Sequence, residues 1–175
     1  MKSKEYFIEF NKLRTGENSF EFCLNSAFFK PYSIEGIIDA EANISLLLNK
    51  TETMYDLHFK LEGSILTNCD NCLDEVNIPL KSTFNLLMKI SETDDYTDDE
   101  IIYITKKLIG YDLSQYLYES FVLSIPQRKL CSKANKECNP MVIDKIGKSN
   151  SGHEFGDEIT ENPLWSELKK KIKNN

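Results

Sequence analysis

Strict alternation of apolar and polar residues over residues 54–61 is the feature that most constrains the fold of this chain. In an extended chain successive side chains point to opposite faces, so this segment presents one apolar and one polar face. The apolar residues are Tyr55, Leu57, Phe59 and Leu61. The pattern predicts a half-buried β-strand, and it places His58 on the polar face as a solvated histidine.

Comparable patterns predict a fold that is mostly β. Further strands are expected over residues 4–13, 20–24, 34–48, 76–90 and 101–105. The acidic run SETDDYTDDE, residues 91–100, is interpreted as a solvated loop, because it lacks the Gly and the closing Glu of a calcium-binding loop.

Two helices are predicted after the last strand. Apolar residues recur at helical spacing from Leu113, with Asp112 as the expected N-cap and an end before Pro126. A shorter helix is predicted to begin at Asn139 and Pro140 and to stop at Gly147.

The pattern of the C-terminal part predicts a linker followed by a helix. Residues 147–161 are rich in Gly, Ser and acids without periodicity, so His153 within them is interpreted as a solvated side chain. Residues 162–175 predict an amphipathic helix with a basic run, and its candidate partner-binding residues are Trp165, Leu168, Ile172, Lys169, Lys170 and Lys171. A helix this short needs a surface to dock on, either its own domain or another molecule.

The predicted fold is α+β, with a mainly antiparallel β-sheet or a partly closed barrel, one packed helix and a C-terminal helix. We expect residues 1–146 to form a single domain, residues 147–161 a flexible linker and residues 162–175 the amphipathic helix. A chain of 175 residues is long enough to bury a core without help from a metal or a disulfide.

Composition excludes some classes of protein. The formal net charge of -7 argues against coating of phosphate backbones by charge alone, which needs many clustered cations. No apolar run approaches the roughly 20 residues that span a bilayer, and the N-terminus lacks the pattern of a signal peptide. We therefore expect a cytoplasmic protein with no membrane partner.

Catalytic signatures are not found in the sequence. There is no phosphate-cradling Gly-rich loop, no nucleophile elbow and no HExxH pair, and two histidines are poor material for a catalytic triad. We predict no enzyme activity and no small-molecule substrate.

The cysteines are the strongest chemical signal. Cys69 and Cys72 form a CxxC between two predicted strands, which is the geometry of a zinc knuckle, and Cys131 and Cys138 form a second, wider pair. Four thiolates suit structural zinc or another metal, but unligated structural thiols and a redox pair remain as alternatives. The fifth cysteine, Cys23, lies in a strand pattern and is interpreted as a free thiol.

Several segments, in order along the chain, resemble the YceD family of large ribosomal RNA subunit accumulation proteins, in the form found in Bacteroidetes-type bacteria. The matching segments are CDNCLDEVNIPL, the acidic loop, DEIIYI, YDLSQYLYESFVLSIPQR, ECNPMVIDKI and NPLWSELKKKI. The combination of CxxCL, a helix leading into LSIP and a terminal helix with Trp is specific to the family, whereas no single segment would be enough.

The resemblance implies a non-catalytic cytoplasmic protein needed for large-subunit ribosomal RNA to accumulate, with metal or nucleic-acid binding. Cys69, Cys72 and Cys138 occupy cysteine positions of the family, and Cys131 falls where similar proteins often have His. Position 71 is Asn where the family commonly has a basic residue.

The expected function is therefore that of a ribosome-biogenesis factor that binds ribosomal RNA or a ribosomal protein in the large-subunit precursor. Zinc, where present, is expected to be structural. A thiol-disulfide redox protein and a generic protein-interaction adaptor with a structural zinc remain the alternatives.

Overall fold

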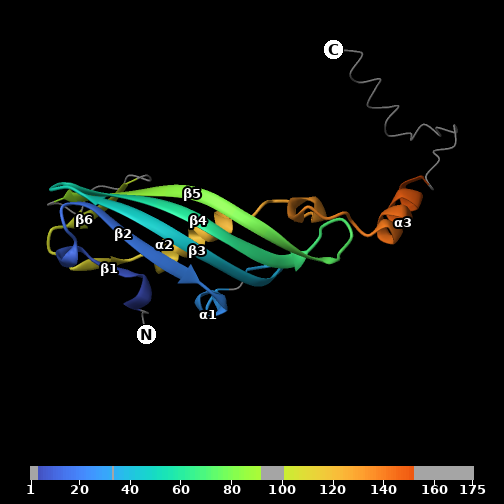
Figure 1. Cartoon of the computed structure of the whole chain (residues 1–175), viewed down its shortest axis with the longest axis horizontal. Helices are drawn as coiled ribbons and strands as arrows, with labels where there is room; N and C mark the ends of the chain where they lie inside the picture. The colour runs from blue at the N-terminus through green and yellow to red at the C-terminus, as the bar shows by residue number, and fades with distance from the viewer. Residues whose placement is uncertain (1–3, 33, 92–100, 152–175) are drawn as a thin grey trace, which may run out of the picture. The chain divides into compact units, whose positions relative to one another are not determined.

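The computed structural model describes residues 4–32, 34–91 and 101–151, and its main feature is a five-stranded sheet (Figure 1). Its strands are β2 (Gly16–Leu24), β3 (Ile37–Lys50), β4 (Met54–Asn68), β5 (Glu75–Ser91) and β6 (Ile101–Thr105). They lie in sequence order, antiparallel except for β6, which pairs with β5 in parallel. The predicted α+β class is confirmed, and the sheet is open rather than closed into a barrel.

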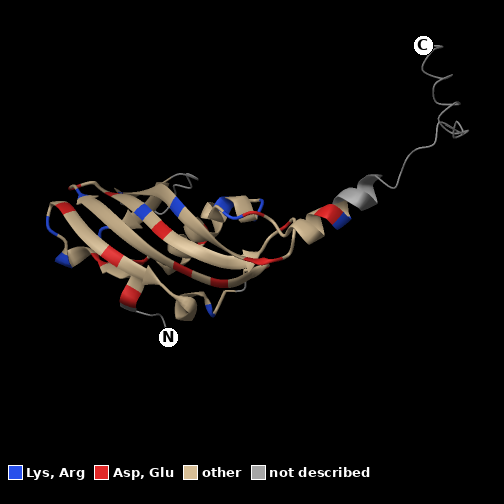
Figure 2. Cartoon of the chain, turned by 45° about the vertical axis from the view of Figure 1, so that its right-hand side comes forward, with Lys and Arg blue, Asp and Glu red and all other residues tan. Residues whose placement is uncertain are grey.

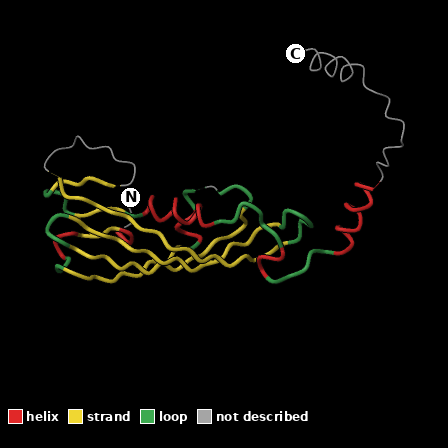
Figure 3. The backbone as a smooth tube through the Cα atoms, turned by 90° about the horizontal axis from the view of Figure 1, so that it is seen from above, coloured by secondary structure: helices red, strands yellow, loops and turns green. Residues whose placement is uncertain are grey.

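One face of the sheet carries the core. Alternate residues of β3, β4 and β5 are buried, among them Ile44, Leu46, Leu48, Leu57, Phe59, Leu61, Ile65, Val76 and Ile78. Helix α2 (Ser114–Ser124) lies along this face, as Figure 3 shows, and buries Leu117 and Phe121. The Tyr116 hydroxyl donates to the Asn85 carbonyl at 2.6 Å, which ties the helix to β5.

The N-terminal segment is wrongly predicted as one long strand. Residues 4–12 form the 3-10 turns η1 (Lys4–Tyr6) and η2 (Phe10–Lys12) around a short strand, β1 (Phe7–Glu9). Its partner β7 (Gly110–Asp112) offers only three residues to pair with, so the ladder cannot extend. The alternation correctly indicated burial, because Tyr6, Ile8 and Phe10 are all buried.

The helix boundaries differ from the prediction in two places. The residue at the N-cap of α2 is Leu113, and Asp112 lies one position earlier, where its Oδ1 accepts the Ser114 backbone N–H at 3.0 Å. Helix α3 (Pro140–Ser151) passes through Gly147 instead of stopping there, since a glycine within a helix costs only about 1 kcal/mol. Asn139 does cap α3, because its Oδ1 accepts the Met141 N–H at 3.2 Å.

The described residues fall into two compact units, the first ending at Cys138 and the second beginning at Asn139. The second unit contains α3, while residues 152–175, with most of the expected linker and the whole C-terminal helix, lie outside the described residues. The short helix α1 (Ser26–Phe29), capped by Asn25, was not predicted; it packs Phe29 against Phe121 of α2, with ring centroids 4.6 Å apart.

Gly63 is required where β3 and β4 pass closely. A β-carbon at this position would lie 2.3 Å from the Glu41 carbonyl oxygen and 2.6 Å from the Ala42 β-carbon. We expect Gly63→Ala to lower the free energy of unfolding by about 1–3 kcal/mol, because backbone must move to admit the methyl group. Chemical denaturation followed by circular dichroism measures this, and Ser64→Ala at the next position serves as the control; equal stability of the two variants would contradict the close approach.

Candidate metal centre

The first cysteine pair lies in the hairpin turn between β4 and β5. The Cys69 N–H donates to the Asp74 carbonyl and the Leu73 N–H to the Cys69 carbonyl, both at 2.9 Å. These bonds close the turn over residues 69–74 and bury both thiols, with Cys69 fully inaccessible and Cys72 3% exposed. The prediction of a CxxC between two strands is confirmed.

The turn contains an unusual backbone conformation. Leu73 has a φ of 63°, in the left-handed region, where a β-carbon costs roughly 1–2 kcal/mol and Gly is favoured. Its side chain is 73% exposed, so little packing within the protein offsets this cost. The turn thus holds a strained leucine that faces solvent.

Cys131 is the first residue of a short 3-10 helix, η3 (Cys131–Ala134), which packs against β5, and Cys138 follows this helix. Asn135 follows with a φ of 54°, a conformation that Asn tolerates well, and reverses the chain. The Lys136 N–H then donates to the Cys131 carbonyl at 3.0 Å. This reversal brings Cys138 back toward the hairpin turn.

Backbone hydrogen bonds join the two loops directly. The Asp70 N–H donates to the Lys129 carbonyl at 2.7 Å, and the Lys129 N–H donates to Asp70 Oδ2 at 2.6 Å. The Arg128 guanidinium lies 3.4 Å from the Asn71 side-chain oxygen. Figure 1 shows η3 beside the end of the sheet where β4 turns into β5. The thiol pairs therefore meet because their loops are fastened to each other.

The four sulfur atoms form a compact cluster. Cys69 and Cys138 lie 3.8 Å apart, Cys72 and Cys131 lie 3.5 Å apart, and all four sulfurs are within 4.8 Å of one another. Zinc–thiolate bonds of about 2.3 Å in a regular tetrahedron separate the sulfurs by about 3.8 Å. The four sulfurs thus supply a tetrahedral donor set, and their separations lie within about 1 Å of those in a regular zinc site.

The thiols differ in how readily they ionise. Burial opposes charge on Cys69, but backbone N–H groups of Cys72, Asn71 and Cys131 directed at its sulfur lower the pKa of this thiol to about 6. Burial raises the pKa of Cys131, and interactions with the other thiols raise it further. Burial also raises the pKa of Cys138. Backbone N–H groups therefore favour the thiolate of Cys69, whereas ionisation of Cys131 and Cys138 would need a cation to share their charge.

Of the other candidate residues, Cys23 and His58 lie within the described part of the chain, and neither belongs to this cluster. Cys23 is exposed on β2 and is not among the clustered thiols. His58 lies on the polar face of β4, as predicted, but has partners that sequence reasoning missed: Nδ1 is 2.8 Å from Asn85 Oδ1 and Nε2 is 3.1 Å from Asp56 Oδ2. Its pKa is raised, chiefly by the bond to Asn85. His153 and the tail residues, including Trp165 and Lys169, lie outside the described residues.

The fold and the thiol cluster define an α+β protein with a candidate structural metal centre at one end of an open sheet. Residues 57–170 match the family model of the large ribosomal RNA subunit accumulation protein YceD, and the chain belongs to this family. Comparison with curated proteins gives no match, and comparison with solved structures gives none either. Within the described residues, every helix falls short of the length and apolar character that crossing a bilayer demands.

The cluster predicts a metal content. Protein purified without chelator under reducing conditions should carry about one zinc per chain, and Cys72→Ser should lose most of it and become less stable, because binding energy is folding energy at such a site. Elemental analysis and thermal unfolding measure the two effects. Cys23→Ser is the matched control and should keep both metal and stability; a well-folded, unoxidised wild-type protein without metal would refute the site.

Burial predicts the order in which the thiols react. In metal-free folded protein near neutral pH, iodoacetamide should modify exposed Cys23 before Cys69. The lowered pKa of Cys69 favours its thiolate, but the reagent cannot reach this buried sulfur. Mass spectrometry of peptides at increasing times gives the order, and chaotrope should remove the difference. Fast modification of Cys69 in the folded protein would instead favour a redox role.

Proposed function

We propose that this protein is a non-enzymatic cytoplasmic factor that supports accumulation of large-subunit ribosomal RNA by binding RNA or a ribosomal protein in the precursor. The observation that carries the proposal is the family match over residues 57–170, which includes all four clustered cysteines. In this function the sheet is a scaffold. A bound metal would make rigid the thiol end, by which we mean the turn of residues 69–74 and the segment of residues 128–138.

Zinc at the cluster is proposed to be structural. Four thiols supply all four positions of a tetrahedral site, whereas catalytic zinc keeps one position for water or substrate. The metal would fasten the hairpin turn to the segment that contains η3. A thiol-disulfide redox role is the second candidate, favoured by the lowered pKa of Cys69 and opposed by the complete burial of that side chain.

The C-terminal helix is proposed as a second contact with the precursor. In the division proposed from the sequence, a domain of residues 1–146 and a linker of residues 147–161 precede this helix at residues 162–175. Its apolar stripe would enter a groove on the partner, and its basic run would lie toward phosphate. Trp165, Leu168 and Ile172 form the stripe, and Lys169, Lys170 and Lys171 form the run.

Deletion of the gene in its native host tests the proposal. Large-subunit ribosomal RNA should fall relative to small-subunit ribosomal RNA, measured by quantitative hybridisation and by sedimentation of subunits. Wild type and Cys23→Ser should restore the ratio, whereas Cys72→Ser and a chain ending at Glu161 should not. An unchanged ratio in the deletion strain would contradict the proposal and would favour the hypothesis of a generic protein-interaction adaptor.

A further inference from the structure

The packing of the protein does not explain why Leu73 occupies a strained position at the thiol end. Leu73 occupies a backbone conformation that favours Gly, yet its side chain is 73% exposed. A single exposed apolar residue is ordinary, but one held at a conformational cost in a closed, rigid turn is not. A contact with another molecule would bury the Leu73 side chain, which the protein's own fold leaves exposed.

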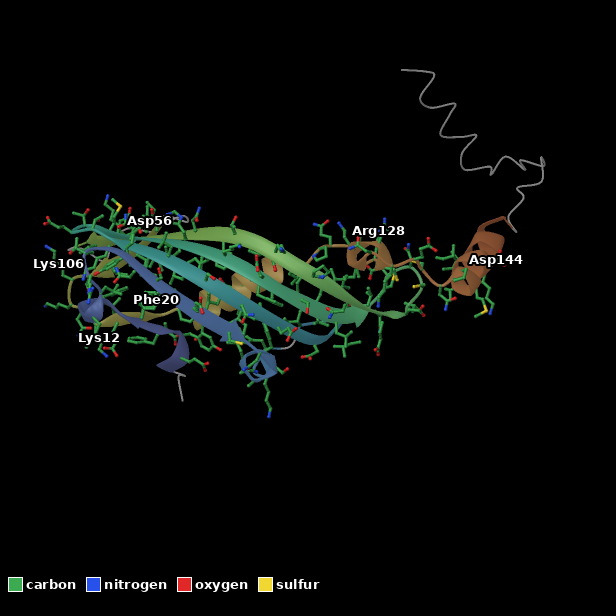
Figure 4. The ribbon with its side chains drawn as sticks, in the orientation of Figure 1. Lys12, Phe20, Asp56, Lys106, Arg128 and Asp144 are labelled. Carbon is green, nitrogen blue, oxygen red and sulfur yellow. The ribbon has the colours of Figure 1, made fainter. Side chains whose placement is uncertain are left out.

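Three exposed cations belong to the loop fastened to this turn. Arg128 reaches the turn through Asn71, and Lys133 and Lys136 lie on η3 and the reversal after it. Within the described part of the chain none of these three forms an ion pair, unlike Lys12, which pairs with Glu9, and Lys60, which pairs with Glu62. Figure 4 labels Arg128 beside η3, and Figure 2 shows Lys and Arg positions along the same stretch.

Acidic residues are also present at this end and limit the strength of any contact. They are Asp70, Asp74, Glu75 and Glu137. The Asp70 carboxylate is occupied by the Lys129 backbone N–H, and none of the four pairs with the three cations. The contact should therefore involve few phosphates, so the slope of log affinity against log salt should be modest, about 0.7 for each phosphate contacted by a single strand.

We propose that Leu73, Arg128, Lys133 and Lys136, here called the knuckle surface, form a contact site for single-stranded RNA. Leu73 offers an apolar platform to an unstacked base, the Arg128 guanidinium stacks or binds phosphate, and the two lysines bind the backbone. Unpaired cations favour a polyanion over a basic protein, because like charges across an interface are unfavourable. The proposal rests on the proposed function and names RNA as the direct partner of this end.

Binding of a labelled single-stranded fragment of large-subunit ribosomal RNA tests the surface. With Arg128→Gln, Lys133→Gln and Lys136→Gln combined, we expect affinity at low salt to fall about tenfold or more and the slope of log affinity against log salt to fall by about 2–3. The matched control combines Arg14→Gln, Lys30→Gln and Lys89→Gln, which removes the same charges from exposed positions elsewhere and should change affinity less than about twofold. Equal losses in both triple variants would overturn the proposal.

Leu73→Gly separates a contact role from a structural one. Gly relieves the left-handed strain, so the variant should melt at the same or a higher temperature while RNA affinity falls by about threefold to tenfold, the worth of one base contact. Metal content should match wild type in every variant. A loss of zinc in the first triple variant would show that its cations balance thiolate charge, and wild-type affinity in Leu73→Gly would remove the platform; both results count against the proposal.

Comparison of RNA binding in vitro with complementation of the deletion strain distinguishes the RNA-binding site from the proposed function in ribosomal RNA accumulation. If wild type restores large-subunit ribosomal RNA but binds no RNA, or binds a ribosomal protein through the knuckle surface instead, the RNA site fails and the proposed function stands. If RNA binding maps to the surface but deletion leaves ribosomal RNA unchanged, the proposed function fails and the site stands.

Discussion

The pairing of β4 with β5 is the interaction on which the rest of the structure depends. It runs without a register shift from Met54 opposite Lys89 to Asn68 opposite Glu75. Because side chains alternate between faces, a slip by one residue would turn the whole apolar set toward solvent. The buried face therefore fixes the register, and the register places Cys69 and Cys72 in the turn at the end of the hairpin.

The same hairpin explains what could be predicted from the sequence. Local alternation carries the information for β4, so Tyr55, Leu57 and Phe59 were correctly expected on one face. The segment 4–13 shows the limit of such patterns, because alternation reports burial but not the length of the partner strand, which here is only Gly110–Asp112. β7 itself escaped prediction because three residues are too few to show a period.

All four cysteines of the cluster were predicted from the sequence, but how the two pairs meet was not, for a related reason. The CxxC spacing by itself implies a turn that contains Cys69 and Cys72. The second pair reaches this turn because hydrogen bonds between Asp70 and Lys129 join two loops that are far apart in the sequence. The partners of His58 were missed likewise, since Asn85 becomes its neighbour only through the strand register. The left-handed conformation of Leu73 carries no sequence signal, because the residue type argues against it.

The wide separation of the two pairs has a consequence for the order of folding during synthesis. Sheet pairing between β4 and β5 is local, whereas Cys69 meets Cys138 only across 69 positions of chain. While a ribosome makes the chain, the hairpin can therefore form long before its two thiols acquire their partners. A metal ion that arrived in that interval would find only two of the four thiols, and the cluster can be complete only when nearly all of the first unit has been made.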